Sequence, residues 1–136
     1  FANSRARLRM TTLYQVAAAN KGIVVGTGNK VEDFGVGFYT KYGDGGVDIS
    51  PIADCNKTEV WELGKELGIL KEIIDAPPTD GLWDDGRTDE GQLGFSYDEL
   101  EDAMINPDSP HKAKYEKIRK QNLHKMDPIP VCKIPS

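Results

Sequence analysis

The order of apolar and polar positions at the start of the chain predicts a helix followed by a strand. Apolar side chains recur at helical spacing over residues 4–20, and Ser4 is the expected cap of this helix. Residues 23–25, Ile-Val-Val, are a short β-branched run bounded by glycines, which is typical of a buried parallel strand. We expect a tight turn at residues 26–29 and a weak helix over residues 31–38 next.

A capping box predicts the start of the next helix. Asn56 and Glu59 have the required spacing, and a helix over residues 57–68 follows them. One more helical turn is expected at residues 71–75. The apolar positions expected to form the buried stripe of the longer helix are Val60, Leu63 and Leu67.

The last third of the chain predicts two further helices and an extended tail. Ser96 and Glu99 form a second capping box. The residues of this helix expected to face inward are Leu100 and Met104. A basic helix over residues 109–123 begins with a serine cap and a proline, and the proline-rich residues 127–136 are expected to be extended.

Residues 77–94 separate these regions with an acidic, glycine-rich and aperiodic sequence. A stretch of this length without secondary structure is either disordered or a functional lid. The pattern gives one strand, whereas a parallel sheet needs several strands between helices. The chain also begins with Phe1 and not methionine. Both observations predict an incomplete α/β domain whose N-terminal half is missing.

Composition narrows the classes of function. The 136 residues carry a net charge of −5, with a pI near 5.0 and a mean hydropathy of −0.51. An acidic balance argues against a general nucleic-acid or membrane-surface binder, because both need a basic surface. Two cysteines are too few for a disulfide framework, so we expect free thiols and a cytoplasmic location. No apolar run reaches the 18 residues of a membrane span.

Three places combine residue types suited to phosphate or metal chemistry. Residues 26–30, Gly-Thr-Gly-Asn-Lys, follow the predicted strand, where open α/β sheets bind ligands. They match neither a dinucleotide fingerprint nor a Walker A loop, and a simple strand-to-helix turn explains them equally well. Glu32 is either a magnesium ligand or an acidic residue favoured by the helix dipole. Residues 41–48, Lys-Tyr-Gly-Asp-Gly-Gly-Val-Asp, are either a ligand-binding loop or a glycine-rich surface loop.

Several ordered motifs together carry a family resemblance. The chain resembles the C-terminal half of the ammonia-dependent NAD synthetases over nearly its whole length. The matching segments are residues 6–10 (Ala-Arg-Leu-Arg-Met), 24–30 (Val-Val-Gly-Thr-Gly-Asn-Lys), 38–48 (ending in the 41–48 motif above), 56–57 (Asn-Lys), 77–82 (Pro-Pro-Thr-Asp-Gly-Leu), 89–90 (Asp-Glu), 93–97 (Leu-Gly-Phe-Ser-Tyr) and 124–125 (His-Lys).

The resemblance implies a fold and a reaction. The fold is α/β, a Rossmann-like parallel sheet with flanking helices of the adenine nucleotide alpha-hydrolase type, here incomplete because N-terminal strands are missing. Residues 1–136 are then the C-terminal part of a single synthetase domain, and the resemblance favours a flexible lid at residues 77–94. The reaction is the ATP- and Mg²⁺-dependent amidation of deamido-NAD to NAD through an adenylated carboxylate, with ammonia as the nitrogen donor. The family also implies a homodimer with deamido-NAD near its interface.

The resemblance assigns roles residue by residue. Thr27, Lys57 and Thr79 match ATP-binding positions, and Glu32 matches a magnesium ligand. The positions that match contacts to deamido-NAD are Arg7, Lys41, Asp48, His124 and Lys125. No residue is assigned as catalytic. We expect the glycine-rich turns at 26–29 and 43–48 to lie side by side, with Lys41, Asp48 and Lys57 pointing into one cleft.

Two departures from the family pattern leave alternatives open. The segment from Glu32 to Lys41 is one residue longer than in some members, which affects the helix register near Asp33. The family's pyrophosphate loop, Ser-Gly-Gly-x-Asp-Ser, has no counterpart here, so we expect the chain alone to be inactive. The alternatives are a noncatalytic nucleotide-binding or assembly fragment and the synthetase domain of a glutamine-dependent enzyme.

Overall fold

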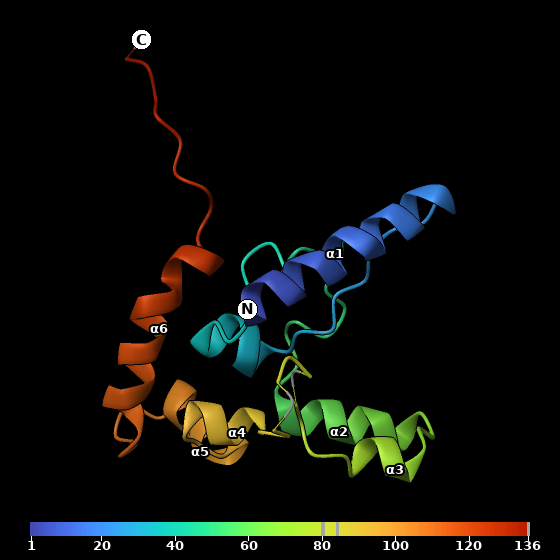
Figure 1. The fold of residues 1–136 in the computed structure, drawn as a ribbon. Coiled ribbons are helices and arrows are strands. Elements are labelled where there is room, and N and C mark those ends of the chain that lie inside the picture. Colours follow the sequence, from blue (N-terminus) through green and yellow to red (C-terminus); the bar gives the residue numbers. More distant parts are fainter. Residues whose placement is uncertain (80, 84, 136) are drawn as a thin grey trace.

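The computed structural model describes residues 1–79, 81–83 and 85–135, and these residues are mainly helical (Figure 1). The elements in chain order are α1 (Ala2–Ala19), the π-helix η1 (Lys30–Val36), α2 (Lys57–Glu66), α3 (Lys71–Ile74), α4 (Asp89–Leu93), α5 (Tyr97–Ile105) and α6 (Lys112–Met126). All the helices expected from the sequence are present, with shifted ends. The short helix α4 is an addition, because it lies in the segment that the sequence pattern left without structure.

The core lies where α4, α5 and α6 pack on η1 (Figure 1). Leu100 on α5 is fully buried, as predicted, and Met104 packs against the core while remaining partly exposed. The buried members of this core are Val31, Val36, Leu93, Phe95, Tyr97, Leu100, Ala103 and Tyr115. The core therefore fixes the position of η1, which follows the glycine turn at 26–29.

The expected buried parallel strand is wrong as stated. Residues 23–25 are extended and make a single isolated parallel bridge, between Val25 and Ile49. Val24 is buried, but Ile23 and Val25 are 60% and 53% exposed. A parallel strand is buried only when neighbouring strands and helices cover it on both sides. The described residues supply one partner segment, so the sheet of a Rossmann-like fold is not formed by these residues alone.

The predicted buried stripe of α2 is also wrong. Leu63 is 45% and Leu67 76% exposed, and Val60 is half-buried. The apolar residues of α1 are similarly open to solvent, with Leu8 at 69% and Leu13 at 55% exposure. α3 and α5 contact α2, but these apolar side chains stay largely exposed among the described residues.

Helix ends follow the capping chemistry with two corrections. Both capping boxes are present, at α2 and at α5. Ser4 does not cap α1, because the helix starts one turn earlier, where the Arg5 amide donates to the carbonyl of Phe1 at 3.0 Å. Ser109 precedes α6, which begins at Lys112. The tail from residue 127 to 135 is extended and leads away from the helices, as Figure 1 shows, and Ser136 lies outside the described residues.

The helix after the glycine turn is wider than the α-helix expected there. Residues Lys30–Val36 form a π-helix that ends at Gly37 in the left-handed conformation, with φ of 68°. A π-helix arises when one extra residue is accommodated in a helix, and such widened turns occur often at functional sites. It starts two residues before Glu32 and contains Asp33.

No helix in the described part of the chain is long and apolar enough to cross a membrane.

We predict that Gly37→Ala destabilises the protein more than Gly68→Ala. Both glycines have φ near 69°, at 68° and 69°, so both substitutions place alanine in a strained conformation that costs about 1 kcal/mol or more. At Gly37 the new Cβ would also lie 2.6 Å from the Cβ of Asn122, whereas nothing lies within 4 Å at Gly68. Urea unfolding should show a further loss of about 1–3 kcal/mol for Gly37→Ala, and equal losses would contradict this packing.

Candidate functional site

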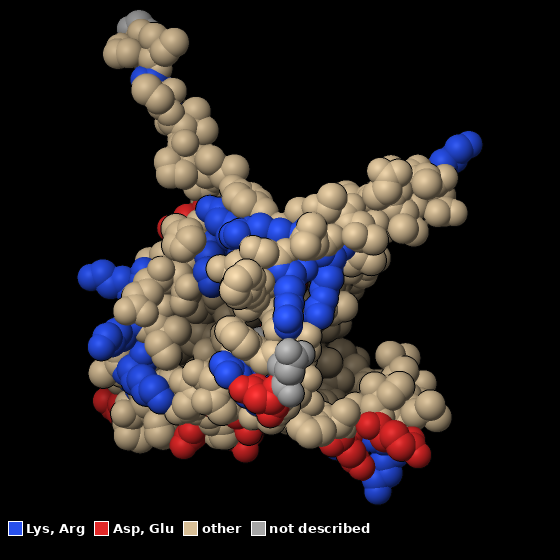
Figure 2. All heavy atoms as spheres, viewed as in Figure 1, with Lys and Arg blue, Asp and Glu red and all other residues tan. Residues whose placement is uncertain are grey.

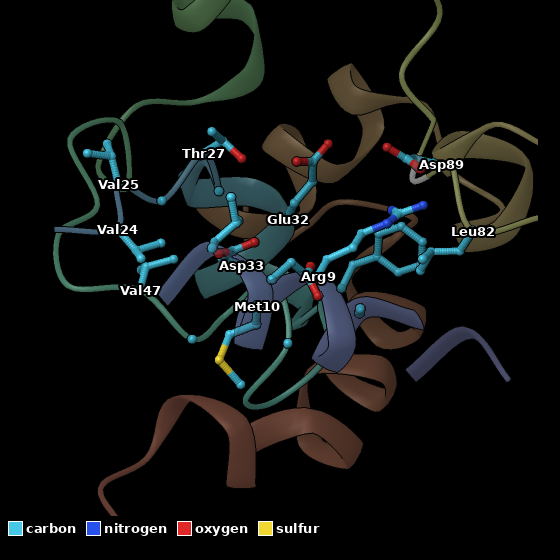
Figure 3. A pocket seen from close by; sticks show the side chains of 18 of the residues that line it. Arg9, Met10, Val24, Val25, Thr27, Glu32, Asp33, Val47, Leu82 and Asp89 are labelled. Atoms are coloured by element: carbon cyan, nitrogen blue, oxygen red, sulfur yellow. The ribbon is translucent and has the colours of Figure 1, made fainter. Parts of the chain in front are cut away.

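A pocket of about 400 Å³ opens beside the glycine turn (Figure 3). Figure 3 shows Val24, Val25 and Val47 at one end of it and Leu82 and Asp89 at the other. Residues of α1, the turn at 26–28, η1 and the loop at 43–47 form its walls. Three residues assigned by resemblance line it, namely Thr27, Glu32 and Thr79.

Glycines allow two backbone segments to meet at this pocket. A Cβ on Gly26 would lie 2.8 Å from Cγ2 of Val47, and one on Gly28 would lie 1.8 Å from Oδ2 of Asp33. The Gly26 amide donates to the carbonyl of Ile49 at 2.7 Å. The two glycine-rich turns thus lie side by side, as expected. A side chain at position 26 or 28 would close the space between them.

Glu32 and Lys57 form an ion pair at the edge of the pocket. Lys57 Nζ lies 3.1 Å from Oε1 of Glu32, and their side chains are 17% and 13% exposed. Tyr97 donates its hydroxyl hydrogen bond to the same oxygen, and Asn29 Nδ2 donates to Oε2 at 2.5 Å. Lys57 does not line the pocket itself, so it reaches this site through Glu32.

The position of Lys57 is set by the start of α2. Lys57 is the first residue of this helix, and Asn56 and Glu59 close its capping box. Glu101 on α5 accepts hydrogen bonds from the Thr58 amide at 3.1 Å and from the Thr58 hydroxyl at 2.8 Å. Two helices that are separate in sequence are therefore tied together next to the lysine.

Asp33 is a site residue that the sequence did not reveal. It lines the 400 Å³ pocket and also a second pocket of about 200 Å³. Burial, together with the negative charges of Asp44 and Glu32, raises the pKa of Asp33 to about 7, while Lys125 opposes this shift. The sequence does not show which side of the helix after the glycine turn faces the pocket. Spacing along the chain therefore does not identify the Asp33 carboxylate as a site residue.

Four of the five residues matched to deamido-NAD form a chain of basic side chains outside the larger pocket. Arg7 Nε donates to the carbonyl of Lys41 at 3.3 Å, and Lys41 Nζ donates to the carbonyl of His124. Lys125 Nζ donates to the carbonyls of Gly37 and Tyr39, each at 2.7 Å. These contacts join α1, the loop and α6.

Among these basic residues, one lines either of the two described pockets. Lys125 lines the smaller pocket, and its burial lowers its pKa while Asp44 and Asp33 oppose that shift. Arg7, Lys41 and His124 line neither pocket. Figure 2 shows Lys and Arg side chains gathered along the N-terminal half of α1 and toward the end of α6. The expectation that Lys41 points into the cleft with Lys57 is wrong, because its ammonium group is bound to the α6 carbonyl.

Asp48 also lies away from both pockets. Its Oδ1 accepts from the Tyr14 hydroxyl at 3.1 Å, and its Oδ2 accepts from the Val24 amide at 2.8 Å. In this structure Asp48 fastens α1 to the extended segment, and the expectation that it points into the cleft is wrong. Both of its oxygens are used by these backbone and hydroxyl donors.

Two arginines of α1 hold the segment beyond Thr79. Arg5 NH1 donates to the carbonyl of Leu82 at 2.6 Å, and Arg9 NH2 donates to the carbonyl of Gly81 at 2.8 Å. Their spacing of four residues places both on one face of the helix, a signal that could have singled them out from the sequence. Arg9 also lines the larger pocket. Asp80 and Asp84 of the expected lid lie outside the described residues.

The residues at the pocket fit a magnesium ion bound together with phosphates. No group of three or more His, Cys, Asp or Glu side chains able to hold a metal occurs among residues 1–79, 81–83 and 85–135. Magnesium commonly takes one or two protein carboxylates and completes its shell with water and phosphate oxygens. Glu32 supplies one carboxylate, and the carboxyl groups of Asp33 and Asp44 line the same pocket.

Comparison with known proteins identifies the family. The sequence model described as NAD synthase matches residues 1–133. The chain belongs to the NAD synthase family. It is 46% identical over 134 residues to the NH(3)-dependent NAD(+) synthetase of Alkaliphilus oremlandii, covering 97% of this chain and 53% of that protein. The NH(3)-dependent NAD(+) synthetase of Methanosarcina acetivorans is 52% identical over 102 residues, which cover 75% of this chain and 39% of that protein.

Solved structures of synthetases have the same fold. NMN synthetase from Francisella tularensis superposes with a TM-score of 0.87 at 35% identity, covering 98% of this chain and 56% of that one. The NH3-dependent NAD synthetase of Campylobacter jejuni superposes with a TM-score of 0.69 at 26% identity, covering 96% of this chain and 54% of that one. The chain spans about half the length of the relatives that it matches.

We predict that Asp33→Asn stabilises the chain at neutral pH. The Asp33 carboxyl has a pKa of about 7 in the folded protein and 3.8 in the unfolded chain, so the folded protein binds more protons between these values. The free energy of unfolding therefore falls as the pH rises from about 4 to 7, by at most about 1.4 kcal/mol per pH unit. Urea unfolding should show equal stabilities near pH 4 and a growing advantage of the variant toward pH 8. Parallel pH profiles would contradict the burial of this carboxyl.

Proposed function

We propose that this chain is the ATP- and substrate-binding C-terminal half of an ammonia-dependent NAD synthetase, a ligase that converts deamido-NAD to NAD. The observation that carries the proposal is the Glu32–Lys57 pair beside a pocket lined by Thr27 and the glycine turn. Membership in the NAD synthase family supports it. The reading as a noncatalytic fragment is less favoured, since an anionic residue and a lysine remain paired at the pocket.

The reaction would proceed in two displacements. An oxygen of the nicotinate carboxylate attacks the α-phosphorus of ATP, and pyrophosphate leaves. Ammonia then attacks the acyl carbon, loses a proton, and AMP leaves with the carboxylate oxygen. When bound, magnesium would neutralise part of the negative charge of the phosphates. A carboxylate is a poor electrophile, and adenylation gives it a leaving group.

Different residues of the chain would bind different parts of ATP and its magnesium ion. Glu32 would hold the magnesium ion, and Lys57 would turn from Glu32 to a phosphate oxygen. Thr27 lies between the two glycines of the turn and would donate to ATP, with Thr79 across the pocket. No residue of the chain is proposed as an acid or base.

Four basic residues and Asp48, all outside the larger pocket, would contact deamido-NAD. Arg7, Lys41, Asp48, His124 and Lys125 are the proposed contacts. Because Lys41 and Lys125 now donate to backbone carbonyls, their phosphate contacts require a change of side-chain conformation. The proposal keeps the homodimer that the family resemblance implies, with deamido-NAD near its interface. The two free cysteines support a cytoplasmic location.

The half-length match supports a sheet completed by the other half of the enzyme. Ile23, Val25 and apolar residues of α1 and α2 are exposed, and the Rossmann-like sheet would form when that half packs there. The segment at 77–94 would act as a lid, with Arg5 and Arg9 holding its described residues over the pocket.

A mononucleotide substrate is the second candidate. The higher TM-score is to an enzyme named NMN synthetase, at 0.87 against 0.69 for the NAD synthetase. Such an enzyme would amidate nicotinate mononucleotide and would need no contacts to a second nucleotide.

The proposed function predicts activity when the chain is joined to the complementary half of the Alkaliphilus oremlandii enzyme. The fusion should form AMP and pyrophosphate only with ATP, Mg²⁺, ammonia and a nicotinate nucleotide. Deamido-NAD and nicotinate mononucleotide are supplied in parallel, and faster turnover of the first supports the main proposal. No product from either nucleotide, in a fusion that folds cooperatively, would contradict it.

We predict that Lys57→Ala in this fusion slows adenylation by about 10²-fold or more, because a phosphate partner is lost. Pyrophosphate release in a single turnover is the measurement. Lys120→Ala, an exposed lysine on α6, is the control and should match the unchanged protein. Near-normal pyrophosphate release by Lys57→Ala would contradict a contact between Lys57 and the ATP phosphates.

A further inference from the structure

Tyr97 occupies an unusual place for a core residue. It is the first residue of α5 and is only 2% exposed, yet its hydroxyl reaches the pocket edge and donates to Oε1 of Glu32. Burial raises its pKa, and the hydrogen bond and charge of Glu32 raise it further. Its backbone amide donates to Oε1 of Glu90 at 3.1 Å. The ring and backbone of Tyr97 are therefore fixed by the core.

The donors on Glu32 differ in what they do to its charge. Asn29, 2% exposed, donates to Oε2, and its own Oδ1 caps the start of η1. Asn29 and Tyr97 are neutral donors that hold one carboxylate oxygen each. Lys57 is charged and sits on a long, flexible side chain. If Lys57 moves to a phosphate, the two neutral donors still fix the carboxylate and leave its negative charge available to a cation.

The ring of Tyr97 also positions Lys57. Lys57 Nζ lies 5.0 Å from the ring centroid, within the range of a cation–π contact. Trp61 on α2 packs edge-on against the same ring, with centroids 5.8 Å apart. The hydroxyl and the ring of one side chain thus contact both members of the Glu32–Lys57 pair.

We propose that Tyr97 is a positioning residue of the ATP–metal site, with its hydroxyl orienting Glu32 toward the pocket and its ring seating Lys57. This inference rests on the proposed function. Outer hydrogen bonds to metal-ligating carboxylates typically change metal affinity by about 10- to 100-fold when removed. The ring and the hydroxyl can be tested separately, because Tyr97→Phe keeps the ring.

Tyr115 offers a matched control. It is a second buried tyrosine of the same core, 6% exposed. Tyr115→Phe removes a hydroxyl from the core at a residue that has no hydrogen bond to Glu32 among those of the described residues. A merely structural role for Tyr97 predicts similar effects of the two substitutions on stability and on binding.

The test measures Mn²⁺ binding in the presence of ATP by the paramagnetic resonance signal of free Mn²⁺, using the chain joined to its complementary half. Tyr97→Phe should weaken Mn²⁺ binding about tenfold or more, and Tyr115→Phe should leave it unchanged. Tyr97→Leu, which also removes the ring, should in addition weaken ATP binding measured by calorimetry. In urea unfolding of the 136-residue chain, the effects of Tyr97→Phe and Glu32→Ala should be non-additive, because either substitution removes the same hydrogen bond.

Equal Mn²⁺ affinity of Tyr97→Phe and the unchanged protein would overturn the inference while leaving the proposed function intact. Additive unfolding effects would overturn the hydrogen bond itself. If the unchanged protein bound no Mn²⁺ with ATP, the proposed function would fail, and this inference with it.

Discussion

The Glu32–Lys57 ion pair is the contact on which the rest of the site depends. Its partners come from η1 and α2, and α5 touches both through Tyr97 and Glu101. A partly buried pair of this kind loses much of its hydration, so it persists only where further hydrogen bonds satisfy the carboxylate. Asn29 and Tyr97 provide those bonds, and the pair thereby links the packing of the core to the edge of the pocket.

The glycine turn and the π-helix position the Glu32–Lys57 pair at the pocket. Gly26 and Gly28 allow the loop at 43–47 and Asp33 to approach closely, and the wider turn of η1 brings Glu32 and Asp33 to the same pocket. Burial first, and then the charges of Asp44 and Glu32, raise the pKa of Asp33, so its ionised form is unfavourable without a positive charge nearby. Lys57, Lys125 and a bound cation would each relieve part of that repulsion.

Much of the fold and part of the site were predictable from local chemistry. The capping boxes at Asn56 and Ser96 predicted helix starts, and the glycine motifs predicted a close approach of two turns. Burial was not predictable for Leu63 and Leu67, because covering their face depends on packing partners that their own periodicity does not specify. Tyr97 and Asp33 were missed for a similar reason: their roles come from which elements meet across long separations in the chain, not from a short motif.

The most direct test of the central claim is crystallographic. Crystals of the chain joined to its complementary half, soaked with Mn²⁺ and ATP, would locate manganese by its anomalous scattering. The account predicts a peak within coordination distance of the Glu32 carboxylate, with Lys57 Nζ moved from Glu32 to a phosphate oxygen and Tyr97 still bound to Glu32. Manganese and ATP phosphates away from Glu32, with the Glu32–Lys57 contact unchanged, would contradict it.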